Sequence, residues 1–216
     1  SGVGFIAALE SQGYLADPSA SPTTLLAGWS VDQAATSGAS ACKLLLPYHP
    51  GRPLASEQRA VAADVLADCR HVGIPLVLEP LFYDVVNAAE REQVVLTTVE
   101  HFADTGADLL KLPFPVDPSV VVDRDARVAA CAAVTERCRQ PWAILSGGGA
   151  FDSFAEQVDA AIAGGASGFM VGRALWGEAA RCSAADRDDV IDHVVVPRWR
   201  HLTDISSATH RSEEPT

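Results

Sequence analysis

The chain has 216 residues, of which 48% are hydrophobic, and its formal net charge at pH 7 is −12. This length and composition predict a single domain with one substantial core. The acidic balance, without any cluster of Lys or Arg, argues against nucleic acid or an anionic membrane as a partner. With no apolar stretch of membrane-spanning length and no signal peptide, the sequence predicts a cytoplasmic protein.

The cysteines and histidines indicate neither disulfide bonds nor a metal site. The five cysteines, an odd number, form no C-x-x-C pair and are expected to be reduced thiols packed as small hydrophobic side chains. The six histidines are scattered without the spacing of metal ligands. We therefore expect a function that uses neither a metal nor another cofactor.

Short apolar segments alternate with Ala-rich amphipathic segments, a pattern typical of alternating strands and helices. The expected strands are 4–9, 41–46, 75–79, 108–112, 142–146 and 168–171. The expected helices are 30–38, 56–72, 88–105, 123–138, 151–164 and much of 186–203. Before several strands a glycine is placed to end the helix in a left-handed cap, at 38, 73, 106 and 164–165. The polar segment 206–216 is expected to be a disordered tail.

Apolar strands that alternate with helices predict a parallel sheet joined by right-handed crossovers. A Rossmann domain would carry G-x-G-x-x-G after its first strand, and this sequence does not. Polar residues instead recur in or just after the strands, namely Glu10, Lys43, Glu79, Lys111, Ser146 and Arg173. In a (β/α)8 TIM barrel such residues converge on one mouth, so the barrel is favoured.

Only six βα units are apparent, so residues 1–205 are expected to form a partial TIM barrel that lacks its first two units. The alternatives are a fragment of a longer protein, or completion of the barrel by another chain or by an unusual closure. About sixty to ninety upstream residues would hold two more units, at about thirty or more residues each.

The chain contains only two lysines among sixteen basic residues, and both lie in expected strands. Lysine normally belongs on a wet surface, and arginine cannot readily lose its proton to become an amine nucleophile. Lys43 and Lys111 therefore indicate amine chemistry, with Schiff-base formation the first candidate. The alternative is a buried Lys–Glu pair that only fixes the strand register.

Strand alternation directs Lys111 into the barrel if Leu110 and Leu112 face the helices. Lys43 and Glu79, on the preceding strands, can reach the same space. Burial and a nearby second ammonium group both favour the neutral amine form of Lys111. Glu79 could then balance the remaining charge and act as a general acid and base.

Two glycine-containing loops follow the last two expected strands, and they predict a phosphate site. Their candidate binding residues are Ser146 and Gly147 in one loop and Gly172 and Arg173 in the other. Glycine lets backbone N–H groups approach an anion, and arginine adds a charged fork of donors. In this class of barrel, the loops after strands 7 and 8 form the usual phosphate site.

Five segments in this order resemble the class I tagatose-bisphosphate aldolase family, which includes the sulfofructose-phosphate aldolases. They are Ala-Cys-Lys-Leu-Leu-Leu, Leu-Val-Leu-Glu-Pro-Leu, Asp-Leu-Leu-Lys-Leu-Pro, Leu-Ser-Gly-Gly and Val-Gly-Arg-Ala-Leu-Trp. The resemblance implies a TIM barrel in which Lys111 forms the imine, Lys43 is the second active-site lysine and Glu79 is the strand glutamate. It also implies two further βα units upstream, the first of which carries an active-site aspartate.

The function implied is the reversible cleavage of a phosphorylated ketose into dihydroxyacetone phosphate and an aldehyde, without a metal. The ketose would be tagatose or fructose bisphosphate or a sulfo-sugar phosphate, and the enzyme a possible homo-oligomer. One alternative is a sugar-phosphate isomerase or epimerase that uses the same anion loops without an imine. The other is a non-catalytic truncated barrel that binds phosphorylated metabolites.

Overall fold

The computed structural model describes residues 3–11 and 17–210, and the chain divides into two compact units. Unit 1 comprises residues 1–112 and 137–141, and unit 2 comprises residues 113–136 and 142–216.

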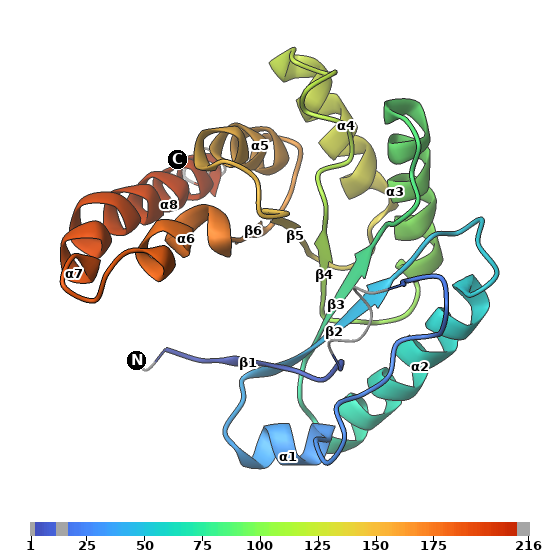
Figure 1. Ribbon diagram of the computed structural model, residues 1–216. Helices are drawn as coiled ribbons and strands as arrows, with labels where there is room; N and C mark the ends of the chain where they lie inside the picture. Colours follow the sequence, from blue (N-terminus) through green and yellow to red (C-terminus); the bar gives the residue numbers. More distant parts are fainter. Residues whose placement is uncertain (1–2, 12–16, 211–216) are drawn as a thin grey trace, which may run out of the picture. The chain divides into compact units, whose positions relative to one another are not determined.

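Unit 1 is a parallel sheet of four strands with three helices (Figure 1). Its elements are β1 (Ile6–Ala8), α1 (Val31–Thr36), β2 (Ala41–Pro47), α2 (Ala55–Val72), β3 (Leu76–Leu81), α3 (Ala88–Phe102) and β4 (Leu109–Leu112). The strands pair in chain order, and the register aligns Ala8 with Lys43, Leu45 with Glu79, and Leu78 with Leu110. One step beyond the last of these pairs, Glu79 is level with Lys111.

The two faces of this sheet differ, as strand alternation requires. In β4, Leu110 and Leu112 are fully buried, whereas Lys111 is only partly buried. The helices lie on one side of the strands in Figure 1, which is the side that the buried leucines need. The lysine therefore stands on the opposite face, as predicted.

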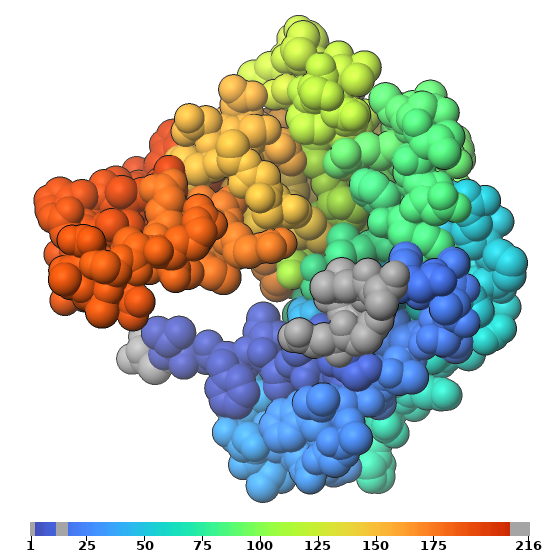
Figure 2. Space-filling view, viewed as in Figure 1, coloured from blue at the N-terminus to red at the C-terminus, as the bar shows by residue number. Residues whose placement is uncertain are grey.

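Unit 2 contains a second parallel strand pair with its own helices. Its elements are α4 (Arg124–Arg137), β5 (Trp142–Leu145), α5 (Phe151–Ala163), β6 (Gly168–Met170), α6 (Arg173–Arg181), α7 (Arg187–Val190), the π-helix η2 (Ile191–Val195) and α8 (Val196–His210). Figure 2 shows α6, α7 and α8 as one continuous orange-to-red surface. The α/β class with parallel strands is confirmed, while the count of eight βα units stays a prediction.

The expected glycine caps form at three of the four predicted junctions. Gly73 has φ 80° and its N–H donates to the carbonyl of Cys69, so it ends α2 in the left-handed conformation. Gly38 and Gly165, with φ 84° and 97°, follow the last residues of α1 and α5 in the same way. Gly106 also has a positive φ of 78°, but α3 has already ended at its cap residue Ala103, so Gly106 belongs to the turn before β4.

Two segments differ from expectation. Residues 173–181 form helix α6, which the sequence did not predict because its central Gly177 weakens the helical pattern. Helix α8 extends to His210, so residues 206–210 of the expected polar tail are helical, and residues 211–216 lie outside the described residues. In the part of the chain that the structure describes, no helix is both long and apolar enough to cross a membrane.

Candidate active site

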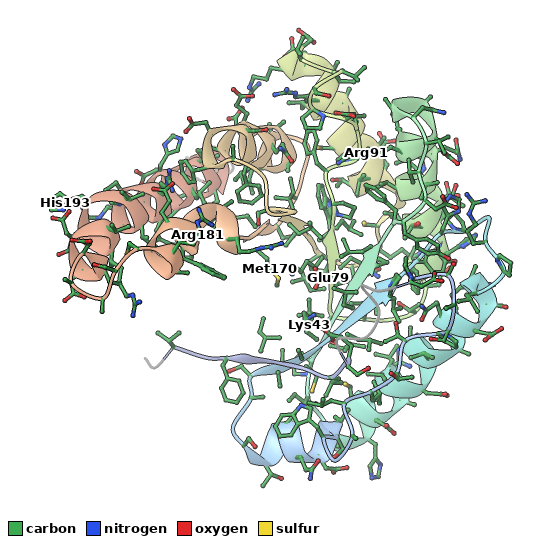
Figure 3. All side chains as sticks on the ribbon, in the orientation of Figure 1. Lys43, Glu79, Arg91, Met170, Arg181 and His193 are labelled. Carbon is green, nitrogen blue, oxygen red and sulfur yellow. The ribbon has the colours of Figure 1, made fainter. Side chains whose placement is uncertain are left out.

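The centre of the candidate site is the Glu79 carboxylate of β3, which faces both lysines. Lys111 Nζ lies 2.8 Å from Glu79 Oε1, and Lys43 Nζ lies 3.3 Å from Glu79 Oε2. Figure 3 shows Lys43 and Glu79 on neighbouring strands, close to each other. The Glu79 side chain is 6% exposed and each lysine side chain 19%, so all three are largely withdrawn from water. The structure thus brings together the three residues that we proposed as catalytic.

A fourth side chain, Glu10, joins this cluster from the end of β1. Lys43 Nζ donates to Glu10 Oε1, and the backbone N–H of Leu45 donates to Glu10 Oε2 over 3.2 Å. The Glu10 side chain is 7% exposed. Two buried ammonium groups need more than one carboxylate to balance them, and this charge count was the signal that could have identified Glu10 from the sequence.

The surroundings of Lys43 determine its charge. Burial acts to lower the pKa of Lys43, but the hydrogen bond to Glu10 and the negative charges of Glu79 and Glu10 act in the opposite direction. Their sum raises the pKa above its usual value. Lys43 is therefore a stable cation at neutral pH, which suits it to stabilising negative charge and not to nucleophilic attack.

The second oxygen of Glu79 is satisfied by charge more than by hydrogen-bond geometry. Glu79 Oε2 is buried and lies 3.3 Å from Lys43 Nζ, but no contact among the described residues gives it a hydrogen bond of good geometry. A carboxylate oxygen has two lone pairs, so this atom can still accept a hydrogen bond beside the Lys43 ammonium group.

In unit 2, the two predicted anion loops meet each other. The backbone N–H of Gly172 donates to Ser146 Oγ over 3.3 Å, which joins the loop after β5 to the loop after β6. Gly147 and Gly148 have φ 56° and 79°, values that favour glycine, in a turn closed by a bond from the Gly149 N–H to the Ser146 carbonyl. The predicted loop residues of this site therefore lie together.

A cavity of about 470 Å3 opens beside these loops in unit 2. It is lined by Gly148, Gly149, Ala150, Phe151, Asp152, Arg173, Ala174, Glu178, Arg181 and Arg198. Of the four predicted phosphate-binding residues, only Arg173 lines it. Sequence reasoning missed Arg181 and Arg198, because the helices that present them pass this cavity only in the tertiary structure.

The two helices that border the cavity begin without a side-chain cap. Helix α5 follows Ala150 and helix α6 follows Gly172, and neither residue offers a side-chain hydrogen bond to the first turn. The first N–H groups of such helices lack intrahelical partners and carry a partial positive charge. Together with Arg173 they form surroundings that suit an anion.

The structure does not indicate a cysteine nucleophile or a metal centre among the described residues. Burial raises the pKa of the Cys131 thiol to about 12, so it is not a ready nucleophile. Across residues 3–11 and 17–210, no group of three or more His, Cys, Asp or Glu side chains is arranged to hold a metal ion.

The fold and the lysine–carboxylate cluster thus define an α/β protein in which two partly buried lysines lie against two buried carboxylates. A model of the DeoC/LacD family of aldolases matches residues 1–178. Because this match covers most of the chain, the protein belongs to the DeoC/LacD aldolase family.

Characterised relatives agree with this assignment. Tagatose 1,6-diphosphate aldolase 1 of Enterococcus faecalis is 28% identical over 197 residues, which cover 81% of this chain and 61% of that protein. Tagatose 1,6-diphosphate aldolase of Listeria monocytogenes is 25% identical over 213 residues, 88% of this chain and 63% of that protein. The chain therefore spans about three fifths of the length of these relatives.

A solved structure of a Schiff base-forming fructose-1,6-bisphosphate aldolase shares the fold. It matches 94% of this chain and 72% of its own with a TM-score of 0.68, at 23% sequence identity. At this identity the likeness shows the fold alone, and it agrees with the predicted α/β class built from parallel βα units.

Proposed function

We propose that the chain is the greater part of a class I aldolase that uses Lys111 to form a Schiff base with a phosphorylated ketose. The observation that carries this proposal is the Glu79 carboxylate, which lies 2.8 Å from the Lys111 amine while also facing the cation Lys43. Imine formation requires an amine nucleophile and a group that transfers protons, and a neighbouring cation is one means by which proteins activate such an amine. The tagatose 1,6-diphosphate aldolases named above support the substrate class.

The proposed reaction begins with attack of the neutral Lys111 amine on the ketone carbon C2. Loss of water gives a protonated imine, which withdraws electrons from the neighbouring bonds. A base then takes the proton of the C4 hydroxyl, the C3–C4 bond breaks, and an aldehyde leaves. The bonding electrons pass into the imine to form an enamine, so the iminium does the polarising work that a metal performs in other enzymes.

Protonation of the enamine at C3 and hydrolysis of the resulting imine release dihydroxyacetone phosphate and regenerate Lys111. We assign the proton transfers to Glu79, together with the aspartate that the family resemblance implies upstream. Lys43, held in its charged form by Glu10 and Glu79, would orient a substrate hydroxyl. The loops of unit 2 at Ser146, Gly147, Gly172 and Arg173 are proposed to bind the phosphate.

Borohydride trapping tests this proposal on the full-length protein. Incubation with dihydroxyacetone phosphate and borohydride, followed by peptide mass spectrometry, should place a reduced adduct on Lys111. The Lys111→Arg variant keeps the positive charge but cannot form the imine, so it should show no adduct. Lys43→Arg should still be trapped, with slower turnover.

The same experiment separates the alternatives. An isomerase or epimerase would convert sugar phosphates without an adduct, and a non-catalytic barrel would show neither conversion nor an adduct. If Lys111→Arg and Lys43→Arg behave alike, the proposed division of roles between the two lysines is wrong.

A further inference from the structure

Helix α6 carries an arginine at each end, and both line the cavity of unit 2. Arg173 is its first residue and Arg181 its last. Neither guanidinium lies within 4.0 Å of a carboxylate among the residues that the structure describes. Figure 3 labels Arg181 on this helix, one of the orange helices of unit 2.

The position of Arg181 depends on a glycine inside the helix. A Cβ atom added to Gly177 would lie 3.2 Å from Arg181 Nη1 and 3.7 Å from the Cβ of Arg173. The guanidinium of Arg181 therefore folds back over Gly177, toward the start of the helix, as side chains on a helix tend to lean. A side chain at position 177 would compete for that space.

Glycine in a helix interior is a costly choice. It destabilises a helix by about 0.5–1 kcal/mol relative to alanine, because glycine loses more backbone conformational freedom when the chain folds. Gly177 is buried in the middle of the nine-residue helix α6. The space that Gly177 leaves to Arg181 offers a physical reason for this residue.

Of the three other charged residues that line the cavity, two pair with each other. Arg198 Nη1 lies 2.9 Å from Glu178 Oε1, and the Arg198 guanidinium stands 4.9 Å from the Phe151 ring centroid. Asp152 is an exposed acid in the first turn of α5. The two arginines of α6 are thus the cations of this cavity that no described carboxylate neutralises.

We propose that Arg181, folded over Gly177, is a second guanidinium contact for the phosphate group and makes this cavity selective for a doubly charged phosphate monoester. A phosphate monoester carries a charge of about −1.5 to −2 at pH 7, and its oxygens match the forked donors of arginine. A sulfonate carries a single charge and needs only one such partner. This inference rests on the assignment of the substrate phosphate to unit 2, and it adds the residues that determine which anion is accepted.

Calorimetric titration of the full-length protein with methyl phosphate, and separately with methanesulfonate, tests the inference without requiring turnover. Arg181→Gln should weaken methyl phosphate binding about tenfold or more, the effect of losing one charge-assisted contact, and should weaken methanesulfonate binding less. Gly177→Ala should weaken methyl phosphate binding in the same direction without lowering the thermal midpoint, because alanine favours the helix. Arg200→Gln, an exposed arginine of α8 away from the cavity, is the matched control and should bind like the wild type.

The pH dependence provides a second readout. The second pKa of a phosphate monoester is about 6, so the wild type should lose affinity for methyl phosphate as the pH falls below that value. In Arg181→Gln this loss should be smaller, because the contact that recognises the second charge is absent. Methanesulfonate keeps one charge throughout and should show no such trend in either protein.

Three results would overturn the inference: no methyl phosphate binding by the wild type, wild-type methyl phosphate binding by either Arg181→Gln or Gly177→Ala, or equal loss of affinity for both anions in Arg181→Gln. Failure of the aldolase proposal looks different. In that case dihydroxyacetone phosphate leaves no adduct on Lys111, while methyl phosphate still binds and still depends on Arg181. Conversely, an adduct on Lys111 together with unaltered anion binding in Arg181→Gln would remove the inference and leave the aldolase.

Discussion

At the scale of single residues, the two lysines of the site differ in their electrostatic surroundings because their neighbours differ. Lys43 contacts two carboxylates, Glu10 and Glu79, whereas Lys111 contacts Glu79. The extra partner favours the charged form of Lys43, which is why we propose Lys111, and not Lys43, as the nucleophile. Strand register produces this difference, because Glu10 follows β1 at a point from which it reaches Lys43.

Glu10→Gln tests the role of this carboxylate. The change removes a charged partner of Lys43, and we expect a loss of about 1–3 kcal/mol in the free energy of unfolding, since Glu79 still compensates part of the charge. The raised pKa of Lys43 means that its contribution to stability is complete below the unfolded value of 10.5 and is lost as the pH rises through the folded value. Urea denaturation at pH 8 and at rising alkaline pH should therefore show a smaller alkaline loss in the variant. Equal alkaline losses in the two proteins would contradict this role.

A second residue-scale prediction concerns His101 of α3. Burial, and then the charge of Arg59, lower the pKa of His101 from 6.5, while Glu100 acts weakly in the other direction. His101 Nδ1 and the Tyr48 hydroxyl lie 2.6 Å apart, and a protonated ring could no longer accept a hydrogen bond there. The folded state therefore binds this proton less readily than the unfolded state, so stability is complete above pH 6.5 and falls as the pH drops through the lowered folded value.

His101→Gln keeps an acceptor for Tyr48 but cannot titrate in this range. Its free energy of unfolding should depend less on pH between 7 and 5 than that of the wild type, as measured by urea denaturation. His71→Gln, an exposed substitution in the last turn of α2, is the control and should keep the wild-type slope. A wild-type slope in His101→Gln would show that this histidine is not linked to folding.

At the scale of elements, the close approach of α4 and α5 depends on one small residue. A Cβ atom added to Gly164 would lie 2.4 Å from the Cβ of Cys131 and 2.9 Å from the backbone N of Ala132. Thr135 strengthens the same junction, since its hydroxyl donates to the Gly164 carbonyl over 2.5 Å and accepts from the Trp142 indole over 3.0 Å. Helix packing in unit 2 thus has no room for a larger residue at this point.

Gly164→Ala should accordingly destabilise the protein by about 1–3 kcal/mol, the usual cost of overpacking. The φ value of Gly164, −86°, is available to alanine, so the loss would be due to the steric contact and not to backbone strain. Gly168→Ala in β6, where an added Cβ meets nothing within 4 Å, is the matched control. Thermal and urea unfolding should separate the two variants, and similar midpoints would refute the packing argument.

At the scale of the whole molecule, the chain is shorter than its relatives and one edge of its sheet is apolar. It covers 61% and 63% of the two tagatose 1,6-diphosphate aldolases. Phe5 lies just before the edge strand β1 and is 47% exposed, and Ile6, the first residue of this strand, is 46% exposed. Since exposed apolar edge strands are normally covered, we propose that two further βα units lie upstream and pack here.

A comparison of the 216-residue chain with a longer natural form tests this. The longer form should give the Lys111 adduct with dihydroxyacetone phosphate, whereas the 216-residue chain should give much less, because it lacks the upstream aspartate that the family resemblance implies. The Lys111→Arg variant of the longer form is the negative control, because it cannot form the adduct. Equal adduct yields from both lengths would show that the upstream units are dispensable for imine formation.

Several features of this protein were determined by local sequence. The alternation of apolar strands with Ala-rich helices, the glycine caps at Gly38, Gly73 and Gly165, and the orientation of Lys111 follow from patterns over a few residues. Such signals survive because backbone geometry repeats along each element. They were sufficient to predict the parallel α/β class and the candidate catalytic residues Lys43, Glu79 and Lys111.

Other features were decided only by tertiary structure. Glu10 binds Lys43 across 33 positions of sequence, and Arg181 faces a cavity whose loops begin more than thirty residues earlier. Helix α6 forms despite its central glycine, because burial of its apolar side offsets a weak propensity. Charge pairing and burial depend on distances in space, which local periodicity does not encode. The sequence by itself therefore determined which side chains are candidates for catalysis. Only the tertiary structure decided which charged groups surround each of them.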